Sequence, residues 1–208
     1  DICLIGHFKT GLPIYLLASD TVCKTQTEEA KQLELEGSAD IMITPVSLGN
    51  CDSTDYFLAW KGERPSSFRP LQLIQETASD KISTIDKAVR TLFPVETSHQ
   101  VMNDICSVTP ILYKPLPQSS DIYIVHYITK DPLQEETLYG PIFWYAKGVV
   151  TLLDNQAEIA AFFSMYQNRY LLLRHIDWHD SENFSEQILN ITDKGFSIVH
   201  HVTAFTAD

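Results

Sequence analysis

The sequence predicts an α+β protein, in which antiparallel or mixed β-sheets pack with a few helices. Short apolar runs bounded by Gly, Pro, Asn or Asp recur along most of the chain, which is typical of strands. The links between these runs are short, which favours hairpins over the long crossovers of a doubly wound parallel sheet. One stretch has its apolar residues at helical spacing instead, so at least one well-formed helix is expected.

The chain is long enough for one large domain or two small ones. It has 208 residues, of which 44% are hydrophobic and 20% are charged, as in an ordinary globular protein. Residues 110–121 (PILYKPLPQSSD) are rich in proline and make the best candidate boundary. We expect an N-terminal half over residues 1–115 and a C-terminal half over residues 120–208, with one continuous domain as the alternative.

The N-terminal half is expected to begin with a hairpin, a short helix and two further strands. These elements cover residues 2–8 and 12–18 for the hairpin, 25–37 for the helix, and 39–46 and 56–60 for the strands. The helix is predicted because Thr25 and Glu28 have the spacing of a capping box, and Gly37 would end it. Residues 63–70 (ERPSSFRP) have the composition of a loop.

The clearest helix begins near residues 77–80. Its apolar residues recur along one helical face, and a proline follows them: Ile82, Ile85, Val89, Leu92 and then Pro94. Proline cannot continue a helix, so we expect the helix to end before it.

The pattern of the N-terminal half returns after the proline-rich segment. A predicted hairpin (121–128 and 140–148) is followed by a helix capped by Asp154 and running through residues 157–166, and then by a strand over 170–178. Two similar hairpin–helix–strand halves would explain this order, although short apolar strands also resemble one another by chance. The chain is expected to close with a helix over 181–190, a turn at 193–195 and a strand over 196–205. Both faces of residues 139–145 (YGPIFWY) are apolar, which favours a strand covered on both sides.

The charge of the chain narrows its range of partners. The formal net charge is −12, and the 15 Lys and Arg residues form no cluster. Binding to nucleic acid or to an anionic membrane needs such clusters, so neither is expected. No apolar run approaches the roughly 18 to 20 residues of a membrane span, and the expected partner is another protein.

The four cysteines, Cys3, Cys23, Cys51 and Cys106, form no C-x-x-C motif. An even number permits two disulfides, but four cysteines over this length do not make a disulfide-dense chain, so a cytoplasmic location is favoured. A processed or secreted form stays open, because residue 1 is Asp and two N-glycosylation sequons begin at Asn183 and Asn190.

The strand predicted over residues 170–179 carries the densest group of candidate metal ligands. His175, Asp177 and His179 alternate along it and therefore share one face. Imidazole nitrogens and a carboxylate are the ligands of zinc sites that keep an open position. Alternate side chains on a straight strand stand almost 7 Å apart, however, so three of them converge only if a bulge tightens the strand. An exposed polar strand end explains the same residues without a metal, and acid/base chemistry without a metal is the third alternative.

His200 and His201 on the last predicted strand would add a ligand if the two strands were neighbours. In that case the ion would lower the pKa of a bound water, and Asp180 or Glu182 could act as the base. The sequence contains neither a G-x-S-x-G nucleophile motif nor a glycine-rich phosphate loop.

We therefore expect a non-catalytic soluble α+β binding or protein-interaction module that needs no cofactor. The alternative is a metal-dependent hydrolase with a divalent ion such as zinc at the His/Asp strand, and whether the protein is an enzyme stays open.

Overall fold

The structure of the protein is a computed structural model. It describes residues 3–5, 7–18, 21–33, 41–51, 58–65, 67–92, 108–119, 121–130, 137–177 and 183–204.

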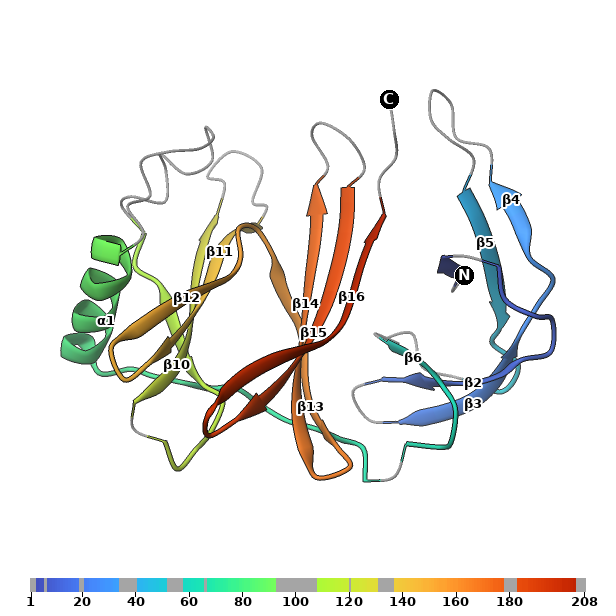
Figure 1. Cartoon of the computed structure of the whole chain (residues 1–208), viewed down its shortest axis with the longest axis horizontal. Coiled ribbons are helices and arrows are strands. Elements are labelled where there is room, and N and C mark those ends of the chain that lie inside the picture. Colours follow the sequence, from blue (N-terminus) through green and yellow to red (C-terminus); the bar gives the residue numbers. More distant parts are fainter. Residues whose placement is uncertain are drawn as a thin grey trace.

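The described residues form three antiparallel sheets and one helix, arranged as four layers (Figure 1). The order of the layers is helix α1, a helix-side sheet, a central sheet and an N-terminal sheet. In Figure 1 these run from the green helix at the left to the blue strands at the right.

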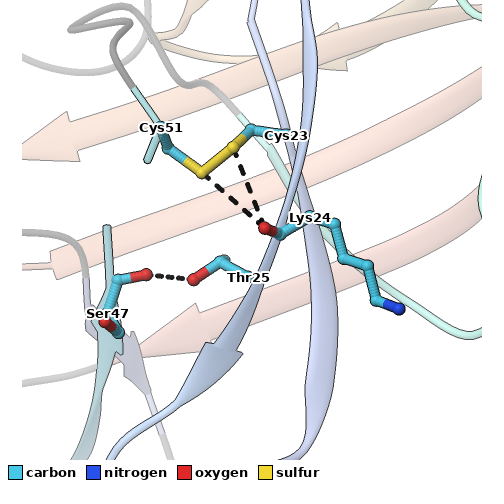
Figure 2. The surroundings of a disulfide bond; sticks show 5 residues. All are labelled: Cys23, Lys24, Thr25, Ser47 and Cys51. Atoms are coloured by element: carbon cyan, nitrogen blue, oxygen red, sulfur yellow. Dashed lines mark hydrogen bonds between the residues drawn. A yellow bond between two sulfur atoms is a disulfide. The ribbon is translucent and has the colours of Figure 1, made fainter. Parts of the chain in front are cut away.

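The N-terminal sheet has the strand order β1-β5-β3-β2-β6, and β4 pairs with β5 in addition. Its strands are β1 (Cys3–Ile5), β2 (Pro13–Leu17), β3 (Val22–Thr27), β4 (Lys31–Leu33), β5 (Ile41–Ser47) and β6 (Leu58–Lys61). A disulfide joins Cys23 in β3 to Cys51, which follows β5 (Figure 2). Beside it, the Thr25 hydroxyl donates a hydrogen bond to the carbonyl of Ser47 in β5. Both links hold β3 and β5 together at this end of the sheet.

The other two sheets are built mainly from consecutive strands that run up and down. The helix-side sheet has the order β12-β11-β10-β9-β8 and the central sheet the order β16-β15-β14-β13-β7. Their strands are β7 (Arg69–Pro70), β8 (Ile74–Gln75), β9 (Ile111–Lys114), β10 (Ile122–Lys130), β11 (Thr137–Ala146), β12 (Val149–Asp154), β13 (Glu158–Met165), β14 (Asn168–Asp177), β15 (Asn183–Thr192) and β16 (Gly195–Ala204).

The middle of the central sheet is buried on both faces, because a hydrophobic core lies on each side of it. Towards the helix-side sheet, Leu171 and Leu189 pack with Ile124 and Trp144. Towards the N-terminal sheet, the cluster consists of Leu17, Phe163, Met165, Leu172 and Ile188. Neighbouring residues of one strand therefore belong to different cores.

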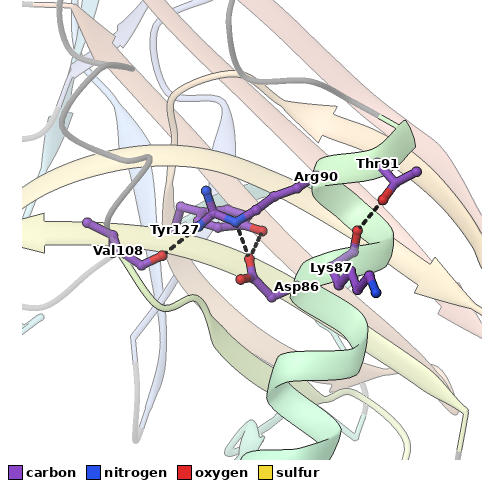
Figure 3. Close-up of polar contacts among 6 residues, drawn as sticks. All are labelled: Asp86, Lys87, Arg90, Thr91, Val108 and Tyr127. Carbon is purple, nitrogen blue, oxygen red and sulfur yellow. Dashed lines mark hydrogen bonds and ion pairs between the residues drawn. The ribbon is translucent and has the colours of Figure 1, made fainter.

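Helix α1 (Ser79–Leu92) covers the outer face of the helix-side sheet. Its Ile85 and Val89 are buried against Tyr127 and Phe143. Figure 3 shows the polar contacts that hold it there. The Tyr127 hydroxyl donates to Oδ1 of Asp86 over 2.6 Å, and Nε of Arg90 donates to the same oxygen over 2.8 Å. Burial, together with this hydrogen bond, raises the pKa of Tyr127.

The helix over residues 79–92 confirms the sequence prediction, although Leu92 is exposed rather than on the buried face. The strand predicted over 139–145 is also confirmed, since Phe143 and Trp144 of β11 are buried in different cores.

The α+β class is wrong: the described part of the chain is mainly β, with a single helix. Where the three other predicted helices contain described residues, those residues form no helix. Residues 22–27 and 31–33 are β3 and β4, residues 158–165 are β13, and residues 183–192 are β15. In β13 the two phenylalanines illustrate the cause, because Phe162 faces one core and Phe163 the other. A strand covered on both faces loses its period of two and has the composition of a buried helix.

The prediction of two similar halves is wrong as well, because the described residues of the two predicted helices form strands. The N-terminal hairpin is also absent: β1 pairs with β5, whereas β2 pairs with β3 and β6. The division into residues 1–115 and 120–208 stays a prediction; β7 and β13, which lie on either side of it, are paired.

Candidate functional site

The predicted His/Asp strand is β14, and its His175 points towards β12 of the helix-side sheet. Nδ1 of His175 lies 3.3 Å from Oδ1 of Asp154, which also accepts a 2.9 Å hydrogen bond from the amide of Gln156. Nε2 of Gln187 in β15 donates to Oδ2 of Asp154 over 3.1 Å. The Asp154 carboxylate thereby links the edge of one sheet to two strands of the next.

Burial alone would raise the pKa of Asp154. The hydrogen bond from His175 and those from Gln156 and Gln187 favour the charged form more strongly, so the pKa lies below its usual value. This carboxylate therefore stays ionised near neutral pH and fixes the orientation of the imidazole. The pair His175–Asp154 was not predicted, because its two residues meet only through the packing of one sheet on another.

Of the other predicted ligands, the structure describes His200 and His201, and it does not bring them next to His175. The side chain of Asp177 and the whole of His179 lie outside the described residues. β15 separates β14 from β16, so His200 and His201 are not on a neighbouring strand, and two strand spacings amount to about 10 Å. The cross-strand partners of His200 and His201 are Ile188 and Gln187, which face opposite sides of the central sheet. Among the described residues no group of three or more His, Cys, Asp or Glu could hold a metal ion. The zinc site stays a prediction, because His179, one of its predicted ligands, lies outside the described residues.

A histidine outside the predicted metal site, His126, is buried. His126 in β10 is 1% exposed, and its imidazole stacks on the ring of Tyr139 with centroids 5.9 Å apart. Its Nε2 has no hydrogen-bond partner among the described residues. Burial lowers the pKa of His126 to about 4, although a backbone hydrogen bond with Ala157 acts in the opposite direction. The alternation of residues 122–126 places His126 on the same face as Ile122 and Ile124, and this pattern could have predicted its burial from the sequence.

The outer side of β16 is the most unusual surface feature of the described chain. β16 is the edge of the central sheet, and no described strand pairs with its outer side. Its residues 197–201 are all exposed. These include Ile198, which is 58% exposed, and Val199, which is 53% exposed. Large apolar side chains on an unpaired edge favour association with another chain.

The remaining sheet edges are protected by the devices that natural proteins use, namely short length, charge and proline. β1 has three residues, β6 has four and ends in Lys61, and β7 consists of Arg69 and Pro70. β8 has two residues, and β12 has six. β16 has ten residues and contains no Lys, Arg, Asp, Glu or Pro.

β16 has one other device that natural proteins use at sheet edges, a β-bulge in its middle. His200 is opposite Ile188 and Ile198 is opposite Leu189, so Val199 is the extra residue and has no partner across the strand pair. Because opposite residues share a face, Ile198 lies on the same side as the buried Leu189. At the border of the core between the helix-side and central sheets, Phe196 contacts Trp144 with ring centroids 5.5 Å apart. The exposed Ile198 lies next along β16 on the same face, so it extends this apolar surface into solvent.

No helix among the described residues is long and apolar enough to span a membrane. Comparisons with models of protein families, with curated proteins and with solved structures gave no match, so the sites must be interpreted from their own geometry.

Proposed function

We propose that the protein is a non-catalytic protein-interaction module, and that it binds an extended segment of a partner protein as an additional strand along β16. The observation that carries this proposal is the ten-residue, uncharged edge with Ile198 and Val199 exposed. In strand addition the main-chain groups of the edge provide affinity, and alternate side chains of the added strand provide specificity.

The exposed side chains of β16 indicate which partner segment would bind there. An added strand would place side chains beside Ile198, on the face that continues the buried core, so an apolar β-branched or aromatic residue is expected there. The net charge of −12 would favour a segment flanked by Lys or Arg, because opposite charges accelerate association.

The proposal is tested with ten-residue peptides displayed on phage and selected on the intact protein. A selected peptide should bind the wild type and lose at least about tenfold in affinity to the variants Ile198→Lys and Val199→Lys, since lysine on an edge opposes pairing. Both side chains are exposed, so these substitutions should leave stability nearly unchanged. Val149→Lys is the matched control, because Val149 is 64% exposed on β12, another edge strand.

Equal binding to the wild type and to both β16 variants would contradict the proposal. So would a set of selected peptides whose affinity depends on Val149 instead.

The metal-dependent hydrolase remains the second candidate, and the pairing of His175 with Asp154 favours it. Metal-binding histidines usually have one ring nitrogen hydrogen-bonded to a carboxylate, and Nδ1 of His175 is held in this way. Nε2 would then coordinate the ion, with Asp177 and His179 as the further predicted ligands, whereas the histidines of β16 lie two strands away. Metal analysis of protein purified without chelator should find about one equivalent, which His175→Ala with His179→Ala removes. Protein without metal, whose melting EDTA does not change, would exclude this candidate.

The cytoplasmic location stays a prediction. The disulfide between Cys23 and Cys51 is an observation against it, because disulfides persist mainly in oxidising compartments.

A further inference from the structure

An open groove lies where the N-terminal sheet meets the segment that leads into the central sheet. Its volume is about 520 Å³, within the range of small-molecule sites. The residues that line it come from the start of β3 and from the segment between β6 and β7: Thr21, Val22, Arg64, Pro65, Ser67, Phe68 and Pro70. None of them belongs to β16 or to the His175–Asp154 pair.

The groove combines an apolar wall with one cationic group. Val22, Phe68 and the two prolines provide the apolar surface. The Phe68 ring packs on Phe163 of the central sheet with centroids 5.7 Å apart, so this wall is fixed to a buried core. Arg64 is exposed, and its guanidinium forms no ion pair or hydrogen bond with any residue that the structure describes.

Thr21 and Ser67, two residues that carry hydroxyl groups, also line the groove. Ser67 has a positive φ of 63°, a backbone conformation that is uncommon for residues other than glycine. The groove therefore offers hydrogen-bond donors and a cation next to a preformed apolar wall.

We propose that this groove binds a small organic anion, namely a carboxylate attached to an apolar or aromatic body. The guanidinium of Arg64 matches the two oxygens of a carboxylate, and the ring of the ligand would pack against Phe68 and the prolines. A chain with a net charge of −12 repels anions in general, so binding here depends on this local cation. The site is independent of the interaction proposed for β16.

The test is an NMR titration of the intact protein with phenylacetate, compared with its neutral analogue phenylacetamide. Phenylacetate should shift the amide signals of residues 64, 67 and 68 in a saturable way, with a Kd on the order of 1–5 mM for a ligand of this size. Phenylacetamide should bind about tenfold more weakly or worse, because it lacks the charge.

Arg64→Gln should reduce phenylacetate binding about tenfold or more, while Arg69→Gln should not change it. Arg69 is the matched control, because it is an exposed arginine of the same segment that does not line the groove. The spectrum of each free variant shows whether the fold is intact. Equal binding of the acid and the amide, equal binding to Arg64→Gln, or no saturable shift up to about 20 mM phenylacetate would overturn the proposal.

Discussion

Acid should destabilise this protein well above the range in which carboxylates titrate, because of the buried His126. Burial lowers the pKa of its imidazole from 6.5 to about 4 in the folded protein. The folded state then binds fewer protons than the unfolded state, so stability is fully present above about pH 6.5 and is lost as the pH falls towards 4. The difference of about 2.5 pKa units corresponds to about 3 kcal/mol, a large part of the 5–15 kcal/mol typical of a domain.

The measurement is urea unfolding of the wild type and of His126→Gln at several pH values between 7 and 4.5. The wild type should lose about 2–3 kcal/mol more than the variant over this interval. His200→Gln is the control, since His200 is exposed, and it should follow the wild type. Equal losses in the wild type and in His126→Gln would refute the argument from burial. An imidazole titration of His126 followed by NMR, with a midpoint near 6.5, would refute it independently.

Three further variants test contacts within and between the layers. Replacing Cys23 and Cys51 by serine opens a loop with a sequence separation of 28, which should lower the free energy of unfolding by about 3–4 kcal/mol in denaturant titrations. Tyr127→Phe removes the hydrogen bond to Asp86 and should lower the same free energy by about 1–3 kcal/mol; an unchanged value would mean that this bond does not stabilise the docked helix. Asp154→Asn should destabilise the protein by about 1–3 kcal/mol, and a neutral result would show that the link between the sheets is weak.

The sequence predicted the elements whose patterns arise within one segment. Helix α1 has one apolar face and a polar outer face, and its spacing from Ile82 to Val89 therefore identifies it. The turn expected at residues 193–195 is present, but it joins β15 to β16 where a helix and a strand were expected. The helix predicted at β13 was wrong for a physical reason. A strand between two cores has apolar residues on both faces, so no periodicity of its apolar residues distinguishes it from a buried helix.

The candidate sites depend on contacts between strands that are far apart in the chain. Alternation placed His175 on the face opposite Ile176, but it could not indicate that Asp154 would meet it from another sheet. The exposure of Ile198 follows from the position of β16 at the edge of its sheet. Strand order is a property of the whole fold, so a short apolar run has the same composition at an edge as in the middle of a sheet.

Hydrogen exchange at the main-chain amides of β16 tests the central proposal most directly. In the free protein, roughly alternate amides between Phe196 and Ala204 point away from β15 and should exchange quickly, while the others are protected by pairing. With a saturating selected peptide, the outward amides should exchange on the order of 100-fold more slowly, whereas those of the β12 edge should not change. Outward amides that are already protected in the free protein, or that exchange equally fast with the peptide bound, would contradict strand addition at β16.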